Sequence, residues 1–255
     1  MAVRQIKNGK AAGPDNIPAE ALKSDIEVRS CTDQISTLWF IVEQSVELNS
    51  SLYINFIDYE KAFDSVDRRT LWKLLRHYGV PEKIVKIIRN SYEGLQCKVV
   101  HGGQLTDAFQ VRTGVRQDCL LSPFLLRPVV DWIMKTSTSE GKHGIQWTAQ
   151  NQLDDSDFAD DLALLSHTHE QMKVKTASVA AVSASVGLSI HKGKTKVLKY
   201  NTENNSPITL DGETLEDVES FTYLGSIIDE QGGSDADVNA RIDKARTAFL
   251  QLKNI

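Results

Sequence analysis

The sequence has little cysteine, and none of it is paired. Its three cysteines, Cys31, Cys97 and Cys119, are odd in number and far apart among 255 residues. This excludes a disulfide-stapled secreted scaffold and a zinc site of the CxxC type, because both need paired or closely spaced thiols. The sequence therefore predicts a protein of a reducing compartment, either the nucleus or the cytoplasm.

Long apolar runs are also lacking. The most apolar stretch, residues 124–134, is interrupted by Arg127, Pro128 and Asp131, and residues 1–10 contain no apolar core of a signal peptide. A membrane-spanning helix needs about 20 consecutive apolar residues. We therefore expect no membrane partner.

The chain contains no internal repeat, and its hydrophobic fraction of 41% is ordinary for a protein with a packed core. Helical and strand-like patterns alternate, which predicts a mixed, α+β fold. The expected helices cover 31–48, 68–78, 81–92, 122–135 and 170–186, with a last one from 235. The expected strands and hairpins cover 52–58, 96–112, 152–166, 196–200, 208–210 and 221–228.

Three acidic residues are placed where a metal site would need them. Asp58 follows a short apolar strand, and Asp160 and Asp161 are adjacent at the expected tip of a hairpin. Carboxylates delivered by two separate rigid elements suit a pair of Mg²⁺ ions, which prefer oxygen ligands and activate phosphoryl chemistry. A solvated polar turn is the alternative explanation of the adjacent acids.

Basic charge is not in excess overall. The chain has 29 Lys and Arg against 34 Asp and Glu, a net charge of −5, which weakly opposes a nucleic-acid partner. Locally the balance reverses, because residues 68–98 hold eight basic and two acidic residues, and residues 192–199 hold four lysines. These segments could bind phosphates, and solvated helix faces are the alternative.

Six segments in order resemble the motif series of non-LTR retrotransposon reverse transcriptases. They are KAAGPDNIPAE (10–20), FIDYEKAFDSV (56–66), TGVRQDCLLSP (113–123), FADD (158–161), GLSIHKGKTKVL (187–198) and FTYLGSII (221–228). The resemblance covers nearly the whole chain. It implies a right-hand polymerase with fingers, an antiparallel palm flanked by helices, and a thumb. It also implies an RNA-directed DNA polymerase, which extends a DNA primer with dNTPs along an RNA template. The implied metal ion is Mg²⁺, and Mn²⁺ is the alternative.

The resemblance implies a role for each of several residues. Asp58 and Asp160 would be the principal metal ligands, Asp161 the third carboxylate, and Lys194 a proton donor to pyrophosphate. Three residues would contact the incoming nucleotide or shape its pocket: Phe63 as a wall under the sugar, Gln117, and Ser122. A hairpin would grip the primer through Phe221, Tyr223, Leu224 and Gly225. Core packing is the alternative for Phe63, and a solvated side chain is the alternative for Lys194.

The chain also departs from the family pattern. Several dozen fingertip residues are missing at a join near Val28 and Arg29, so we expect a remnant of fingers over 1–50, a palm over 51–230 and the start of a thumb over 231–255. Asp118 replaces a glycine and would repel phosphates. In the helix from Ser122, Arg127 is expected to be a buried charge and Pro128 to kink or shorten the helix.

Three functions therefore remain open from the sequence. The leading hypothesis is an internally deleted and truncated reverse transcriptase domain that transfers nucleotides with two metal ions and impaired activity. The second is a catalytically inactive retrotransposon relic that at most binds nucleic acid. The third, a metal-dependent nuclease, is weakest because the acids are accompanied by no further His or Glu constellation.

Overall fold

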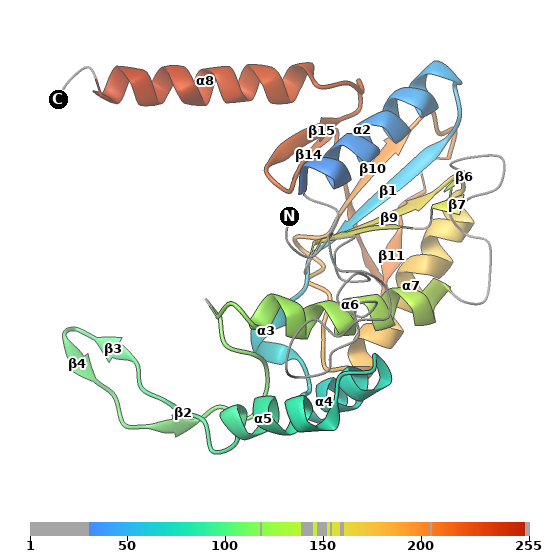
Figure 1. Cartoon of the computed structure of the whole chain (residues 1–255). Coiled ribbons are helices and arrows are strands. Elements are labelled where there is room, and N and C mark those ends of the chain that lie inside the picture. The colour runs from blue at the N-terminus through green and yellow to red at the C-terminus, as the bar shows by residue number, and fades with distance from the viewer. Residues whose placement is uncertain are drawn as a thin grey trace, which may run out of the picture. The chain divides into compact units, whose positions relative to one another are not determined.

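A computed structural model describes residues 31–117, 119–138, 145–146, 152–153, 155–158, 161–204 and 206–252. The chain forms two compact units. In the described residues, one unit covers 63–129, and the other combines 31–62 with the residues from 130 onward. Figure 1 shows the elements of both units along the chain.

The larger unit is built on a five-stranded sheet in the order β13-β10-β1-β9-β8. Its strands are β1 (Leu52–Ile57), β8 (Asp155–Phe158), β9 (Asp161–Ser166), β10 (Lys196–Tyr200) and β13 (Glu216–Asp217). All pairs are antiparallel except β10 with β13. Every residue of the central strand β1 is buried, because both faces of the sheet are covered.

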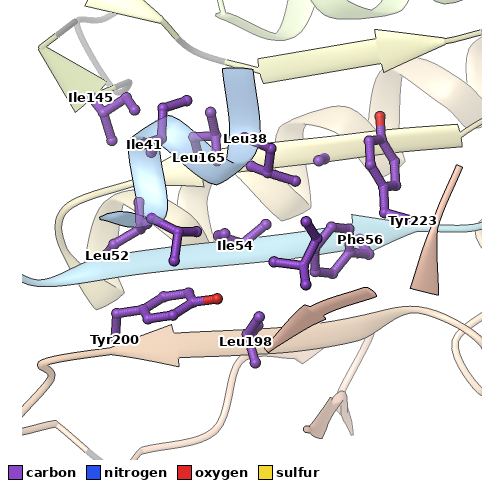
Figure 2. Packing of buried hydrophobic residues seen from close by; sticks show 13 residues of the cluster. Leu38, Ile41, Leu52, Ile54, Phe56, Ile145, Leu165, Leu198, Tyr200 and Tyr223 are labelled. Carbon is purple, nitrogen blue, oxygen red and sulfur yellow. The ribbon is translucent and has the colours of Figure 1, made fainter. Parts of the chain in front are cut away.

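One face of this sheet packs against α2 (Cys31–Glu47). The apolar side chains of α2 at Leu38 and Ile41 meet the face of β1 that carries Ile54 and Phe56 (Figure 2). These residues recur at helical spacing in α2 and at every second position in β1, so each element presents one continuous apolar face. These residues belong to one hydrophobic core cluster of the unit.

The opposite face packs against α7 (His169–Ser185). The contact includes a buried hydrogen bond of 2.8 Å, in which Asn55 Nδ2 of β1 donates to Thr176 Oγ1 of α7. The helix begins at Thr168, whose side chain accepts a hydrogen bond from the Gln171 amide, and it ends before Gly187. Two helices on two faces thus hold the central strands in place.

The larger unit also contains a hairpin, a further helix and two short ladders. The hairpin β14 (Ser220–Tyr223) and β15 (Ser226–Asp229) turns at Leu224 and Gly225, which have φ angles of 48° and 82°. Helix α8 (Asp235–Leu252) contacts β15. Two short ladders join β6 (Ile145–Gln146) with β7 (Gln152–Leu153), and β11 (Thr209–Leu210) with β12 (Glu213–Thr214).

The smaller unit contains mostly helices. Helix α3 (Ala62–Ser65) is followed by α4 (Arg68–His77) and α5 (Glu82–Tyr92), and α4 begins at Asp67, whose carboxylate accepts from the Thr70 amide. Two nested hairpin ladders come next: β2 (Gln96–Cys97) with β5 (Phe109–Gln110), and β3 (Val100–His101) with β4 (Gln104–Leu105). Helix α6 (Ser122–Thr138) begins in this unit, and the chain enters the larger unit at residue 130.

The predicted α+β class is confirmed, and the long predicted helices and strands are present within a few residues of their expected bounds. For α6, the expected shortening at Pro128 and the expected burial of Arg127 were wrong, whereas the alternative of a kink stays a prediction. The helix continues through Pro128 to Thr138, and Arg127 is half-buried and not enclosed in the core. The join near residues 28 and 29 and the replacement at Asp118 lie outside the described residues. The predicted finger, palm and thumb boundaries stay a prediction.

Candidate active site

Asp58 directly follows the fully buried strand β1, and its side chain is 38% exposed. Its backbone is fixed on both sides. The Asp58 carbonyl accepts a hydrogen bond of 2.8 Å from the His191 amide, and the Asp58 amide donates to the buried Thr195 Oγ1 at 3.4 Å. The carboxylate is therefore presented to solvent from a rigid strand end.

The ammonium group of a lysine lies beside the Asp58 carboxylate. Lys194 Nζ is 3.8 Å from Asp58 Oδ1, and the lysine side chain is 63% exposed. The Lys194 amide donates to the His191 carbonyl at 3.0 Å, so the same turn that fixes the Asp58 backbone also carries the lysine. An exposed ion pair of this length contributes little to stability. The Lys194 ammonium group nevertheless lies next to the Asp58 carboxylate.

Strand register brings a second carboxylate to the same edge of the sheet. The antiparallel pairing of β1 with β9 ends at Ile57 and Leu162. Asp58 and Asp161 are the next residues on these strands, so they follow in register opposite each other. Because side chains alternate between faces, both point to the face that carries Phe56. Asp161 is exposed.

Asp160 lies outside the described residues, but the strands on both sides of it are paired. Phe158 of β8 is opposite Asp161 of β9, and only residues 159 and 160 separate them in the sequence. The hairpin that the sequence predicts to carry the acids is therefore confirmed up to these two residues.

The hairpin β14–β15 packs next to Asp161. Tyr223 Oη donates to the Asp161 carbonyl at 3.3 Å, and the ring of Phe221 stacks on that of Phe56 with centroids 4.4 Å apart. The Tyr223 ring is buried, whereas Leu224 is half-buried and Gly225 exposed. Tyr223 thus anchors the hairpin to the sheet, and the turn at 224 and 225 is its accessible part.

The three predicted nucleotide-contacting residues lie in the smaller unit. Phe63 is half-buried in α3, and Ser122 is buried at the start of α6. Gln117 is exposed, and its Nε2 lies 3.5 Å from Asp64 Oδ2 of α3. Phe63 is thus part of the short helix α3, and the Gln117 side chain contacts Asp64 of the same helix.

The two basic segments differ in their surroundings. Three of the four lysines in 192–199 are paired with acids from 211–217: Lys192 with Glu213 at 2.7 Å, Lys196 with Glu216 at 2.5 Å and Lys199 with Asp217 at 2.6 Å. In contrast, five basic residues are exposed on α4 and α5 without an acid partner in the described ion pairs. These are Arg69, Lys73, Lys83, Lys86 and Arg89.

The residues at the sheet edge fit a hard divalent cation in their chemistry. Asp58 and Asp161 supply carboxylate oxygens, the ligand type that such ions prefer, and both side chains are accessible. The part of the chain that the structure describes contains no cluster of three or more His, Cys, Asp or Glu side chains able to hold a metal ion. In the same part, no helix is long and apolar enough to cross a membrane.

Comparison with known proteins decides the family. The family model described as "Reverse transcriptase (RNA-dependent DNA polymerase)" matches residues 19–228, most of the 255-residue chain. The chain belongs to the reverse transcriptase family. Together with the R2 relatives of the chain, this match confirms the predicted reverse transcriptase domain of a non-LTR element. Members of this family generally use divalent metal ions.

The relatives of this reverse transcriptase domain include Pol polyproteins of R2 retrotransposable elements. The Drosophila melanogaster protein of element R2DM is 30% identical over 164 residues, covering 64% of this chain and 15% of the relative. The Nasonia vitripennis R2 protein is 26% identical over 237 residues, covering 87% of this chain and 22% of the relative. The domain therefore spans less than a quarter of the length of either relative.

Solved structures agree on the fold. Apo telomerase from Candida tropicalis, truncated from its C-terminal domain, matches with a TM-score of 0.56 at 16% identity over 78% of this chain and 38% of that chain. Telomerase from the same organism in complex with a fragment of telomeric RNA matches with a TM-score of 0.57 at 14% identity, over 84% and 36% of the two chains. These similarities confirm the predicted polymerase palm.

Sequence reasoning missed the residues that support the site. Thr195 and His191 fix the Asp58 backbone, and Arg68 binds the backbone of the segment before Gln117. In the sequence Arg68 is one of the eight basic residues of 68–98, and nothing in its local pattern distinguishes it from Arg69. The carbonyls of Val111, Thr113 and Gly114 that Arg68 binds lie more than 40 residues away in the chain.

Proposed function

We propose that this reverse transcriptase domain performs RNA-directed DNA polymerisation. The 3′-oxygen of a DNA primer attacks the α-phosphorus of a dNTP paired to an RNA template, the bond to pyrophosphate breaks, and the 3′-hydroxyl loses its proton. The observation that carries this proposal is the register of Asp58 with Asp161 at one sheet edge, with Lys194 3.8 Å from Asp58. The proposed compartment is the nucleus or the cytoplasm.

The carboxylates of Asp58, Asp160 and Asp161 would hold Mg²⁺, with Mn²⁺ as the alternative ion. When bound, two such ions neutralise phosphate charge and make the primer hydroxyl easier to deprotonate. The residues of the chain do the rest. Lys194 donates a proton to the leaving pyrophosphate, and the turn at Leu224 and Gly225, with Phe221 and Tyr223 behind it, grips the primer.

The nucleotide pocket is assigned to the smaller unit. Phe63 forms a wall under the sugar and rejects a 2′-hydroxyl by contact, Gln117 touches the incoming nucleotide, and Ser122 shapes the start of the helix beneath it. The shared attachment of Phe63 and Gln117 to α3 supports these roles, because residues that select one ligand must keep a fixed separation.

An inactive nucleic-acid-binding relic is the second candidate. It is favoured by the pairing of Lys192, Lys196 and Lys199 with acids, which neutralises three of the four lysines in the segment 192–199. The replacement at Asp118 and the short fingers also favour it. In this case the domain binds template and primer but does not extend the primer.

Primer extension on an RNA template with Mg²⁺ and dNTPs separates the two candidates. We expect Asp58→Asn and Asp160→Asn each to lower kcat at least about 100-fold, because they remove charge that acts on the transition state. The matched control is Asp211→Asn, an exposed acid whose side chain is 72% accessible, which should leave extension unchanged. If the wild-type protein binds template–primer but does not extend it, the polymerase proposal is contradicted and the inactive, nucleic-acid-binding relic is supported. If the wild type and both variants extend the primer equally, the carboxylates of Asp58 and Asp160 take no part in the reaction.

A further inference from the structure

Arg68 at the start of α4 binds the backbone of a distant segment through its whole guanidinium group. Its Nε donates to the Gly114 carbonyl at 2.7 Å, its Nη1 to the Val111 carbonyl at 2.8 Å, and its Nη2 to the Thr113 carbonyl at 2.8 Å. Nη1 also approaches the Tyr92 carbonyl at 3.4 Å. Charge-assisted hydrogen bonds to three carbonyls of one short segment fix its position and its orientation.

The guanidinium is itself held in place. Arg68 lies over the ring of Tyr92 with its Cζ 4.9 Å from the ring centroid, and Arg116 lies 5.4 Å from the same ring. Tyr92 is buried and packs on Trp72, with centroids 5.9 Å apart. Arg116 Nη2 donates to the Ser91 carbonyl at 2.7 Å, which ties the far end of the segment to α5. A planar fork stacked on an aromatic ring loses little freedom on forming its hydrogen bonds.

The other side of the segment is pressed against α3. The Gly114 amide donates to the Val66 carbonyl at 2.9 Å, and the Val115 amide donates to the Phe63 carbonyl at 2.5 Å. Gly114 has a φ angle of +70°, and a Cβ atom there would lie 2.3 Å from the Phe63 carbonyl oxygen. The backbones of the segment and of α3 therefore touch directly, with Arg68 behind the segment.

This arrangement joins the two residues assigned to nucleotide selection. Thr113 Oγ1 donates to the Asp64 carbonyl at 2.9 Å, and Gln117 Nε2 lies 3.5 Å from Asp64 Oδ2. We propose that Arg68 is a positioning residue that sets the separation of Phe63 and Gln117, and so controls affinity for dNTPs and rejection of ribonucleotides. This inference rests on the proposed roles of Phe63 and Gln117. A simple structural tether would stabilise the unit without affecting selection.

Two substitutions test the role of the fork. Arg68→Lys keeps the charge but cannot reach three carbonyls, and Arg68→Met keeps much of the stem without the charge. The matched control is Arg246→Lys in α8, an arginine whose side chain is 74% exposed. We expect amide hydrogen exchange at Gly114 and Val115 to be at least about tenfold faster in both Arg68 variants, because the hydrogen bonds of these two amides would open locally. Exchange in β1 should not change, and the Arg246 variant should match the wild type.

Nucleotide affinity is then measured without turnover, by equilibrium dialysis of labelled dGTP and GTP with Mg²⁺ against the whole protein on an RNA template with a dideoxy-terminated DNA primer. We expect Arg68→Lys to weaken dGTP binding about tenfold and to lower the dGTP-to-GTP affinity ratio at least about threefold, because misplacement of positioning groups acts on selection. Affinity for template–primer should stay within about twofold of the wild type.

The outcomes separate this inference from the proposed function. Unchanged exchange at Gly114 and Val115, or faster exchange with an unchanged affinity ratio, would overturn the positioning role and leave Arg68 a tether. Wild-type protein that binds dGTP selectively but does not extend a normal primer would overturn polymerisation alone. Wild-type protein that binds neither nucleotide would overturn both.

Discussion

At the scale of single residues, Gly114 is the glycine of the smaller unit's described residues at which an added Cβ would clash with other atoms. Its φ of +70° is rarely adopted by other residues, and the Cβ of an alanine would lie 2.3 Å from one backbone atom and 2.5 Å from two more. Backbone atoms cannot rotate away as a side chain can. Substitution must therefore separate the segment from α3 or distort both.

We expect Gly114→Ala to lower the free energy of unfolding by about 2 to 4 kcal/mol, since left-handed strain adds to a backbone clash. Gly79→Ala is the matched control, because Gly79 has a φ of +79° but no atom within 4 Å of an added Cβ. Its cost should be about 1 kcal/mol. Urea unfolding followed by circular dichroism measures both, and equal losses would show that the close approach to Phe63 is unimportant.

The acids at the sheet edge can be picked out from the sequence, whereas the residues that support them cannot. Asp58 directly follows an apolar strand and Asp161 begins another, so strand periodicity and side-chain chemistry both single them out. Arg68 and Gly114 become distinctive only through contacts across 46 residues of chain. Neither the hydrophobic pattern nor the charge pattern of a sequence predicts a hydrogen bond from a guanidinium to a distant carbonyl. Residues such as Arg68 and Gly114 can therefore be recognised only in the tertiary structure.

At the scale of elements, the start of α8 is joined to β15 by one buried carboxylate. The Asp237 side chain is 5% exposed, accepts from the Ile227 amide at 3.0 Å and from Arg241 Nε at 2.7 Å, and Arg241 Nη2 donates to Ser226 Oγ at 2.7 Å. Burial disfavours the charged form. The hydrogen bonds from Arg241, Ile227 and Ser226, together with the positive charge of Arg241, outweigh this effect and lower the pKa of Asp237 below its ordinary value.

A pH series tests this anchor. Because the pKa of Asp237 is lower in the folded than in the unfolded protein, its ionised form stabilises the fold above the unfolded value, near 4, and this stabilisation is lost as the pH falls through the folded value. We expect Asp237→Asn to cost about 1 to 3 kcal/mol at pH 7, and the cost to shrink below about pH 4. Asp243→Asn, from an exposed pair with Arg246, should cost less than about 0.5 kcal/mol. If the difference in the free energy of unfolding between the wild type and Asp237→Asn does not change with pH, the ionised carboxylate of Asp237 is not what joins α8 to β15.

Helix α6 shows where local rules failed at this scale. A proline inside a helix removes one backbone hydrogen bond, here the one to the carbonyl of Phe124, four residues earlier. The Phe124 side chain is 59% exposed and Pro128 is half-buried, so this side of the helix borders water, which can hydrate the carbonyl. The sequence marked Pro128 correctly as unusual. It could not show that the defect faces solvent, because that depends on which side of the helix is packed.

At the scale of the whole molecule, the net charge of −5 is unevenly distributed. Acids of 211–217 pair with the lysines of 192–199, so these two segments largely neutralise each other. The exposed basic residues of α5, Lys83, Lys86 and Arg89, are spaced by three and follow one face of the helix. Net charge alone therefore underestimates the capacity of the smaller unit to bind phosphates.

The salt dependence of nucleic-acid binding tests this distribution. Each lysine that contacts a phosphate contributes about one unit to the slope of log K against log salt concentration. We expect the double substitution Lys83→Gln and Lys86→Gln to make this negative slope less steep by about two for binding of an RNA–DNA template–primer. Lys196→Gln with Lys199→Gln is the matched control with the same change of charge, and it should leave the slope nearly unaltered, because both lysines are already paired with acids. Equal slopes for the two double variants would mean that binding responds only to net charge, and a larger loss in the control would move the phosphate contacts to the lysines of 192–199.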